Sequence, residues 1–221
     1  MKPTTRRTAG STSGRAAQIV LRLRQAIPVV RIELAYRSPW ELLVATILSA
    51  QCTDQRVNQV TPALFRRYPT PQSMATSEKT DLEALIKPTG FYKSKAKNLL
   101  GCAQAVSTRF GGQVPNTMDE LTSIPGVGRK TANVLLGGVF GKPGLVVDTH
   151  VKRTANRLDL SRSQNPEQIE RDLQATYPQA EWTDISQRLL LHGRYVCLAR
   201  KPRCRACSLY DVCGWEGKLP T

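Results

Sequence analysis

Four of the six cysteines in this chain lie close together near its C-terminus. Cys197, Cys204, Cys207 and Cys213 follow a C-x6-C-x2-C-x5-C pattern. Thiolates this dense in a sequence bind a metal or an inorganic cluster, because disulfides require an oxidising compartment and no signal peptide is recognisable. The spacing differs from the paired knuckles of common zinc folds and favours a loop around one [4Fe–4S] cubane. Structural zinc, and a role without a ligand, remain alternatives.

A second pattern, LTSIPGVGRKTA at residues 121–132, predicts two helices joined by a tight turn. Gly126 and Gly128 allow the backbone to bend and to approach a ligand closely. The amide groups of the turn and of the following helix start carry partial positive charge, which favours phosphate. The pattern therefore predicts a helix–hairpin–helix over residues 118–140 that grips a DNA backbone through Gly126, Val127, Gly128 and Arg129, without reading base sequence.

Lys130 falls in the first turn of the second hairpin helix, where a lysine is electrostatically misplaced. The helix start and the neighbouring Arg129 both disfavour the charged amine. Since only a neutral amine attacks carbon, this position suits a nucleophile. A lysine that only binds phosphate is the alternative.

Asp148 lies in the segment VVDTH, directly after an apolar run. It is predicted to be the N-cap of a helix that begins at Thr149. Capping keeps a carboxylate ionised, so Asp148 is a candidate to stabilise a cation or to accept a proton. A cap with no chemical role is the alternative.

The chain has 221 residues, a net charge of +15 and a pI near 10.0, which indicate a polyanionic partner, most simply nucleic acid. Residues 1–31 carry seven basic and no acidic side chains, and residues 193–205 carry five and none. No stretch is long and apolar enough to span a membrane. Residues 1–15 lack apolar periodicity and predict a disordered basic arm, with an organelle transit peptide as the alternative.

Helical patterns fill the remainder, and no segment shows sustained strand alternation, so we expect an all-α fold. Residues 42–50 are apolar nearly all round and predict a central helix, opened by a capping box at Ser38. A second capping box is predicted at Thr117, and Pro62 predicts a kink or a restart. Cys52 and Cys102 lie in helical patterns and are interpreted as small buried hydrophobes.

The hairpin with Lys130, the VDTH segment and the four-cysteine loop occur together in this order in the endonuclease III family, which the chain resembles from about residue 16 to 215. The segments LSAQCTD (48–54), GFYKSKA (90–96) and HGRY (192–195) are also similar to that family. The resemblance implies a two-lobed glycosylase fold, with DNA lying across the cleft between the lobes. Residues 33–146 would form a six-helix barrel lobe, and residues 16–32 with 147–221 an iron–sulfur cluster lobe.

The resemblance further implies a bifunctional DNA glycosylase and abasic-site lyase of base excision repair that removes oxidised pyrimidines. Lys130 would attack C1′ and form a Schiff base that permits β-elimination 3′ to the lesion, while Asp148 would assist departure of the base. Gln51 would fill the gap left by the extruded base, and Phe91 stands where the family usually has an aliphatic wedge. His150 belongs to the implied DNA-binding set, and Arg200, Lys201 and Arg203 would bind phosphates.

The implied cofactor is a [4Fe–4S] cluster, the implied partner is damaged double-stranded DNA, and we expect a monomer in the bacterial cytoplasm at the nucleoid. Organelle import is the alternative location. Two other functions remain open. One is an adenine-specific mismatch glycosylase on the same scaffold, which usually lacks a lysine at the position of Lys130. The other is a non-enzymatic DNA-binding module.

Overall fold

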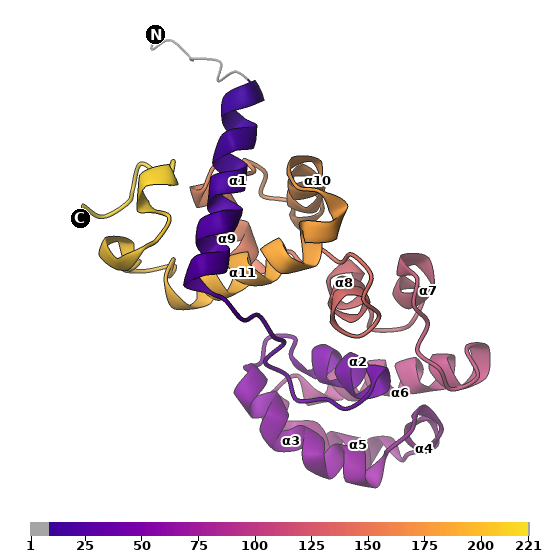
Figure 1. Cartoon of the computed structure of the whole chain (residues 1–221). Coiled ribbons are helices and arrows are strands. Elements are labelled where there is room, and N and C mark those ends of the chain that lie inside the picture. Colours follow the sequence, from indigo (N-terminus) through magenta and orange to yellow (C-terminus); the bar gives the residue numbers. More distant parts are fainter. Residues whose placement is uncertain (1–8, 221) are drawn as a thin grey trace. The chain divides into compact units, whose positions relative to one another are not determined.

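The computed structural model describes residues 9–220. In that range the chain forms α-helices and short 3₁₀-helices and no strand (Figure 1), which confirms the all-α prediction. None of the described helices is long and apolar enough to cross a membrane. The chain divides into two compact units. We call Ile32–Gly144 the hairpin unit, and Met1–Arg31 with Leu145–Thr221 the cysteine unit. The boundaries expected from the sequence lay before residues 33 and 147.

The hairpin unit consists of consecutive helices of very different length. They are α2 (Pro39–Leu48), α3 (Asp54–Arg67), α4 (Pro71–Ala75), α5 (Lys79–Ile86), the 3₁₀-helix η1 (Lys87–Thr89), α6 (Tyr92–Arg109), α7 (Met118–Thr122) and α8 (Arg129–Gly138). As predicted, α2 is central: it is apolar nearly all round, and Leu42, Leu43 and Leu48 are fully buried. It packs against α3, α6 and α8, so the hairpin helix α8 rests directly on the apolar centre of this unit.

Side chains cap the starts of α2, α3, α4 and α7 in this unit, although the two predicted capping boxes are only half formed. The Ser38 hydroxyl accepts from Glu41 N, but the Glu41 carboxylate accepts from Arg37 N instead of Ser38 N. Thr117 accepts from Glu120 N, and the Glu120 carboxylate accepts from the Thr117 hydroxyl. In both cases the cap oxygen satisfies the first turn, and the acidic side chain takes a different nearby donor.

Pro62 does not interrupt α3, so the predicted restart was wrong, and the predicted kink stays a prediction. The helix runs unbroken from Asp54 to Arg67. Proline removes one backbone donor from a helix, but the ring of Pro62 is exposed while Val57 and Leu64 on the opposite face are fully buried. Burial of that face holds the helix together across the missing hydrogen bond.

The two remaining cysteines differ in their surroundings. Cys102 is fully buried on α6, where desolvation raises the pKa of its thiol to about 12, as suits a small core hydrophobe. Cys52 is only half-buried, and it lies in the turn between α2 and α3 rather than in a helix. The interpretation as a buried helical residue therefore holds for Cys102 and not for Cys52.

The cysteine unit combines helices from both ends of the chain. They are α1 (Ala9–Ala26), α9 (Thr149–Arg157), α10 (Pro166–Thr176), the 3₁₀-helix η2 (Gln179–Glu181), α11 (Trp182–Tyr195) and the 3₁₀-helices η3 (Cys204–Ala206) and η4 (Tyr210–Val212). α11 packs against α1 and α9. Ile19 and Leu23 of α1 are fully buried in the same core as Val151 and Leu189. The long α1 thus closes a core built mostly from C-terminal residues.

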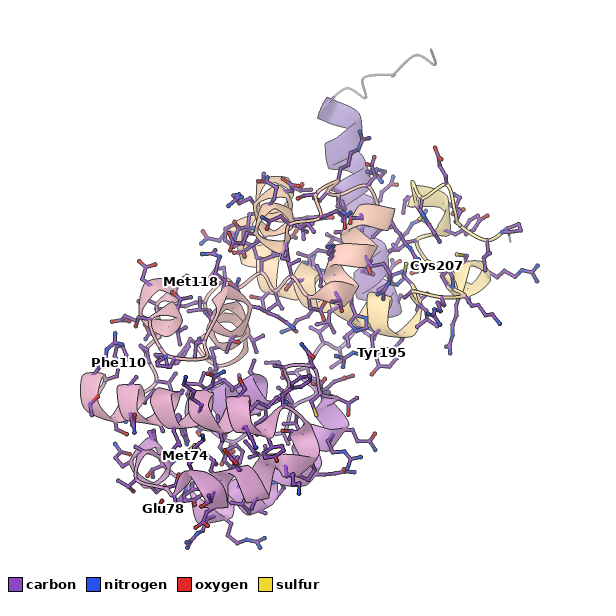
Figure 2. All side chains as sticks on the ribbon, turned by 180° about the vertical axis from the view of Figure 1, so that it is seen from behind. Met74, Glu78, Phe110, Met118, Tyr195 and Cys207 are labelled. Atoms are coloured by element: carbon purple, nitrogen blue, oxygen red, sulfur yellow. The ribbon has the colours of Figure 1, made fainter. Side chains whose placement is uncertain are left out.

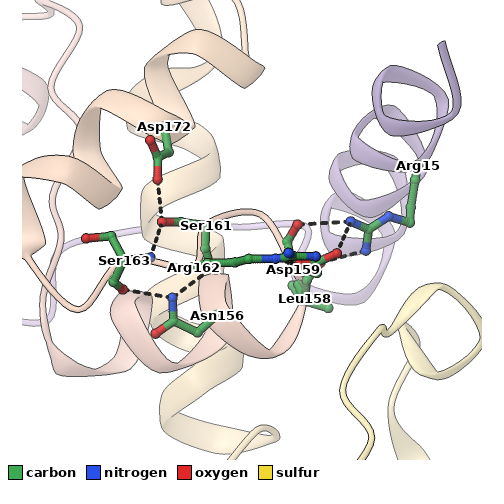
Figure 3. A network of polar contacts seen from close by, with 8 residues as sticks. All are labelled: Arg15, Asn156, Leu158, Asp159, Ser161, Arg162, Ser163 and Asp172. Carbon is green, nitrogen blue, oxygen red and sulfur yellow. Dashed lines mark hydrogen bonds and ion pairs between the residues drawn. The ribbon is translucent and has the colours of Figure 1, made fainter. Parts of the chain in front are cut away.

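The predicted disordered arm is wrong for residues 9–15, which form the first turns of α1; residues 1–8 lie outside the described residues. The reason is tertiary anchoring by Arg15 (Figure 3). Its guanidinium donates to the Leu158 carbonyl at 2.6 Å and to the Asp159 carbonyl at 3.1 Å, and its neighbour Ala16 is buried. These contacts hold a helix that glycine- and serine-rich composition alone disfavours.

Candidate functional site

Apolar side chains anchor the hairpin between α7 and α8 in the core of the hairpin unit. Leu121 and Ile124 are buried in the core of the hairpin unit, and the Val127 side chain is only 6% exposed. Gly126 has φ of +80°, and a Cβ there would lie 2.8 Å from Asn98 Cβ on α6. Both the backbone conformation and the close approach therefore require glycine. With the Val127 side chain turned inward, this residue offers a ligand its backbone alone.

The start of α8 has no side-chain cap. Its N-cap is Gly128, which is extended (φ −95°, ψ 174°), exposed, and without other atoms near the place of a Cβ. Side chains cap the starts of α2, α3, α7, α9 and α10. The first amides of α8 therefore have no side-chain acceptor at the cap position, which is the arrangement that accepts a phosphate oxygen.

Lys130 is the second residue of α8 and is exposed. Within residues 9–220 its amine has no hydrogen bond or ion pair. Ala132 and Leu135, farther along the same helix, are fully buried and fix the helix on its apolar side. The structure thus presents an amine without partners next to a predicted phosphate-binding turn, carried by a helix whose position is set by packing.

Asp148 is the N-cap of α9, as predicted, and is half-buried. Its Oδ1 accepts from His150 N at 2.9 Å and from Val151 N at 2.8 Å. Its Oδ2 has no hydrogen bond to the described residues. The carboxylate is consequently oriented through one oxygen, while the other stays available.

Close packing of α9 against α11 explains the glycine in the HGRY segment. A Cβ on Gly193 would lie 2.7 Å from Thr154 Oγ1 and 3.0 Å from the His150 carbonyl oxygen. Arg153 of α9 spans this contact: its guanidinium donates to the Gly193 carbonyl at 2.7 Å and lies 3.2 Å from the His150 Nδ1. The start of α9, with Asp148 and His150, is therefore tied to the end of α11.

All four C-terminal cysteines line one pocket of the cysteine unit, together with aromatic and basic residues such as Trp215 and Lys218. Each is a free, half-buried thiol, and Cys207 is labelled in the yellow C-terminal segment of Figure 2. No group of three or more His, Cys, Asp or Glu side chains within residues 9–220 is arranged to hold a metal ion. The donor set of four thiols around one pocket fits an iron–sulfur cluster in its chemistry.

Two arginines of α9 hold the backbone of this loop, and neither was predicted from the sequence. Arg153 Nε donates to the Cys197 carbonyl at 2.9 Å. Arg157 donates to the Leu198 carbonyl at 2.8 Å and the Ala199 carbonyl at 3.1 Å, and its guanidinium carbon stacks 3.9 Å from the Trp215 ring centroid. Their i, i+4 spacing was the one available signal, and it is equally typical of a solvated helix face.

Most of the proposed DNA contacts outside the hairpin are exposed side chains on loops, whereas His150 lies in the first turn of α9 and is half-buried. Arg200, Lys201 and Arg203 are all exposed between the first two loop cysteines, and Lys201 has a positive φ of 50°. In the hairpin unit, Gln51 follows α2 and Phe91 is the N-cap of α6; Gln51 is exposed and Phe91 is 66% exposed. A large aromatic side chain this exposed has no packing role within its own unit.

The basic residues of α1 have a different use. Arg22 pairs with Asp211 at 3.3 Å, and Arg24 pairs with Glu181 at 3.2 Å and Asp184 at 2.9 Å. These contacts join α1 to other parts of the cysteine unit. Part of the N-terminal positive charge is therefore structural, whereas the cations at 200–203 remain on the surface.

These features agree with the results of comparisons with known proteins. Residues 44–179 match the family model of the HhH-GPD superfamily base excision DNA repair proteins. The chain is 49% identical over 208 residues to an endonuclease III of Synechocystis, covering 94% of this chain and 95% of the relative. It is 41% identical to the endonuclease III of Escherichia coli K12, with coverage of 91% and 96%.

A solved structure described as a trapped endonuclease III–DNA covalent intermediate superimposes with a TM-score of 0.88 at 37% identity, covering 91% of this chain and 95% of that one. The chain belongs to the endonuclease III family of HhH-GPD base excision DNA repair proteins. The resemblance drawn from the motifs is thereby confirmed.

Proposed function

We propose that this base excision repair glycosylase and abasic-site lyase acts on oxidised pyrimidines in duplex DNA, with Lys130 as nucleophile and Asp148 as the carboxylate that assists departure of the base. The observation that carries the proposal is the exposed, partnerless amine of Lys130 beside the uncapped start of α8. The hairpin amides would bind the DNA backbone there and bring a sugar to the amine.

The covalent step requires only the Lys130 amine, the DNA and water. The neutral Lys130 amine attacks C1′, the N-glycosidic bond breaks, and the base leaves with its electron pair and a proton. The sugar ring then opens as the C1′–O4′ bond breaks and O4′ takes a proton, which turns the adduct into a Schiff base and acidifies C2′. Loss of the C2′ proton expels the 3′ phosphate by breaking the C3′–O3′ bond, and hydrolysis of the imine frees the enzyme. The available Oδ2 of Asp148 is suited to stabilise the developing cation and to assist the base in leaving.

Gln51 and Phe91 fit the task of filling a duplex from which a nucleotide has been extruded. A base inside a duplex is unreachable, so the nucleotide must be flipped out, which costs a few kcal/mol. Exposed side chains that enter the gap offset that cost. An aromatic residue at position 91 unstacks base steps as an aliphatic wedge does, with a larger contact face.

We assign a [4Fe–4S] cluster to Cys197, Cys204, Cys207 and Cys213. When bound, the cluster supplies iron–thiolate bonds that cross-link the loop and so fix the exposed Arg200, Lys201 and Arg203 for phosphate contact. Its role in this proposal is structural. We further propose that the protein is monomeric and works on DNA at the bacterial nucleoid.

Excision assays on a panel of duplexes test the substrate class. Wild-type protein should release thymine glycol and leave a strand cut, whereas Lys130→Gln should do neither. DNA affinity should fall steeply with salt, since several phosphates are neutralised. Release of adenine opposite a mismatched purine, with thymine glycol untouched, would identify the adenine-specific enzyme instead. Binding without any excision would identify a DNA-binding module.

A further inference from the structure

A buried lysine in the hairpin unit has no role in the chemistry above. Lys95 lies in the first turn of α6 and is only 4% exposed. Its ammonium donates to the Leu48 carbonyl and to the Thr89 carbonyl, each at 2.8 Å. Desolvation lowers the pKa of Lys95, which is the expected consequence of placing a cation inside the protein. Because burying a cation is costly, packing alone does not explain a lysine at this position.

Both acceptors of Lys95 are the ends of helices. Leu48 is the last residue of α2 and Thr89 the last of η1. Carbonyls at helix C-termini lack intrahelical donors and carry partial negative charge, so a cation is favourable there. In a continuing helix Cys52 N would bond to Leu48, but it bonds to the Ser49 carbonyl at 3.1 Å. One ammonium thus caps two helices that end at the same place.

The two capped helix ends are followed directly by the two residues that we propose enter the gap in the duplex. Gln51 lies three residues after Leu48, and Phe91 lies two residues after Thr89. The backbone of Lys95 adds a further tie, because its N–H donates to the Phe91 carbonyl at 3.0 Å. Lys95 therefore contacts one loop through its side chain and the other through both its side chain and its backbone.

Gln51 and Phe91 share an uncommon backbone conformation. Their φ values are 52° and 49°, and they are two of the four non-glycine residues with positive φ in the described part of the chain. Side chains other than glycine persist in this region only where the surroundings impose it. The shared ammonium supplies such a constraint for both loops at once.

We propose that Lys95 is a positioning residue that holds the Gln51 and Phe91 loops in one fixed geometry, so that both side chains enter the duplex together around a single extruded nucleotide. The inference deepens the proposed function and rests on it. An apolar residue at position 95 would fill the same volume but leave the two helix ends unconnected. The buried cation is retained for the geometry it imposes.

The test separates steps that need the two loops from steps that do not. Excision of thymine glycol from a duplex requires extrusion and gap filling. Cleavage of a single-stranded oligonucleotide with a preformed abasic site requires only the nucleophile and phosphate contact. Both rates are measured under enzyme excess for wild type, Lys95→Met and Lys97→Met. The last variant loses an exposed charge from the same helix and serves as the matched control.

Lys95→Met should lower the duplex excision rate about ten- to a hundredfold, because displaced groups around a reacting centre have effects of that order. Its single-strand cleavage should stay within about twofold of wild type, and Lys97→Met should lower neither rate more than about threefold. Melting temperature confirms folding; if Lys95→Met does not fold, Lys95→Leu, which likewise lacks a donor, replaces it with the same expectations. Equal losses on both substrates, or wild-type excision, would overturn the proposal.

A double-mutant cycle adds the readout that a merely structural lysine would not move. In a Gln51→Ala, Phe91→Ala background, Lys95→Met should lower the excision rate no further, because the loops that Lys95 positions no longer carry side chains that fill the gap in the duplex. Multiplying effects would show that Lys95 acts elsewhere and would contradict the proposal. Failure of wild-type protein on both substrates would refute the proposed function itself. A contradictory Lys95 result with active wild type would refute only the positioning role.

Discussion

The hairpin unit and the cysteine unit hold their functional residues by different means. In the hairpin unit Lys130 stands on α8, which packs on the fully buried side chains of α2. In the cysteine unit the loop from Cys197 to Cys213 contains one buried residue, Leu209. That loop is held by guanidinium groups that donate to its carbonyls. One site is positioned by apolar packing and the other by polar contacts and the metal that we propose.

The difference predicts how each unit fails. A unit held by apolar packing tolerates the loss of a surface contact but is destabilised when a core side chain is truncated. A loop held by polar contacts depends instead on a few long side chains. Changes in the two units should therefore give separable losses of stability and of bound cluster. The following substitutions test this from the largest expected effect to the smallest.

Leu43→Ala in α2 should lower the free energy of unfolding by about 2–5 kcal/mol, because it opens a cavity at a fully buried position. Thermal and denaturant unfolding of the protein with its cluster measure the loss. Leu21→Ala, at a position 58% exposed on α1, is the matched control and should change stability by about 0.5 kcal/mol at most. Equal effects of the two would show that α2 is not the centre of the core.

Arg157→Met should leave the fold intact but speed loss of the cluster about tenfold or more, since residues around a metal site typically contribute that much to affinity. It removes the donors to the Leu198 and Ala199 carbonyls. Iron content and the decay of visible absorbance measure the effect. Arg162→Met, whose side chain is 86% exposed, is the control. Unchanged cluster lifetime in Arg157→Met would mean that the cysteines alone hold the loop.

Asp184→Asn should destabilise the cysteine unit by about 1 kcal/mol near neutral pH. Burial favours a raised pKa for Asp184, yet hydrogen bonds from Arg188 and Arg24 hold that pKa below its ordinary value. The stabilisation is therefore present above about pH 4 and is lost as pH falls through the folded pKa. Unfolding curves of both proteins should converge in acid.

Asp211→Asn is the matched control, because Asp211 also pairs with an arginine of α1 but is 78% exposed. It should change stability by about 0.5 kcal/mol at most. A larger effect for Asp211 than for Asp184 would contradict the assignment of the Arg24–Asp184 pair as the one that fastens α1.

The smallest expected effect is a difference between the alkylation rates of two cysteines of the hairpin unit, with no change in stability. Cys102 should resist alkylation in the native protein at pH 8, because burial raises its pKa to about 12 and leaves no reactive thiolate. Half-buried Cys52 should react first. Peptide mass spectrometry after brief treatment distinguishes them. Faster labelling of Cys102 would indicate that the core of the hairpin unit opens readily.

The sequence predicts the features that depend on local patterns, but not the polar contacts between residues far apart in the chain. The apolar run of α2, the hairpin and the Asp148 cap are local patterns, and the structure has them where they were predicted. Lys95, Arg153 and Arg157 are buried or partly buried through partners 40 or more residues away. A long basic side chain looks the same in sequence whether it faces solvent or a distant carbonyl. Arg15 shows the same limit, since its partners lie 143 and 144 residues away.

Borohydride trapping on abasic duplex DNA tests the assignment of Lys130 most directly. Wild-type protein should be captured as a covalent adduct, and peptide mapping should place the DNA remnant on Lys130. Lys130→Gln should give no adduct while binding the same duplex with affinity within about threefold of wild type, since one exposed charge is lost. An adduct of undiminished yield in Lys130→Gln, or a remnant mapped to another lysine, would contradict the account.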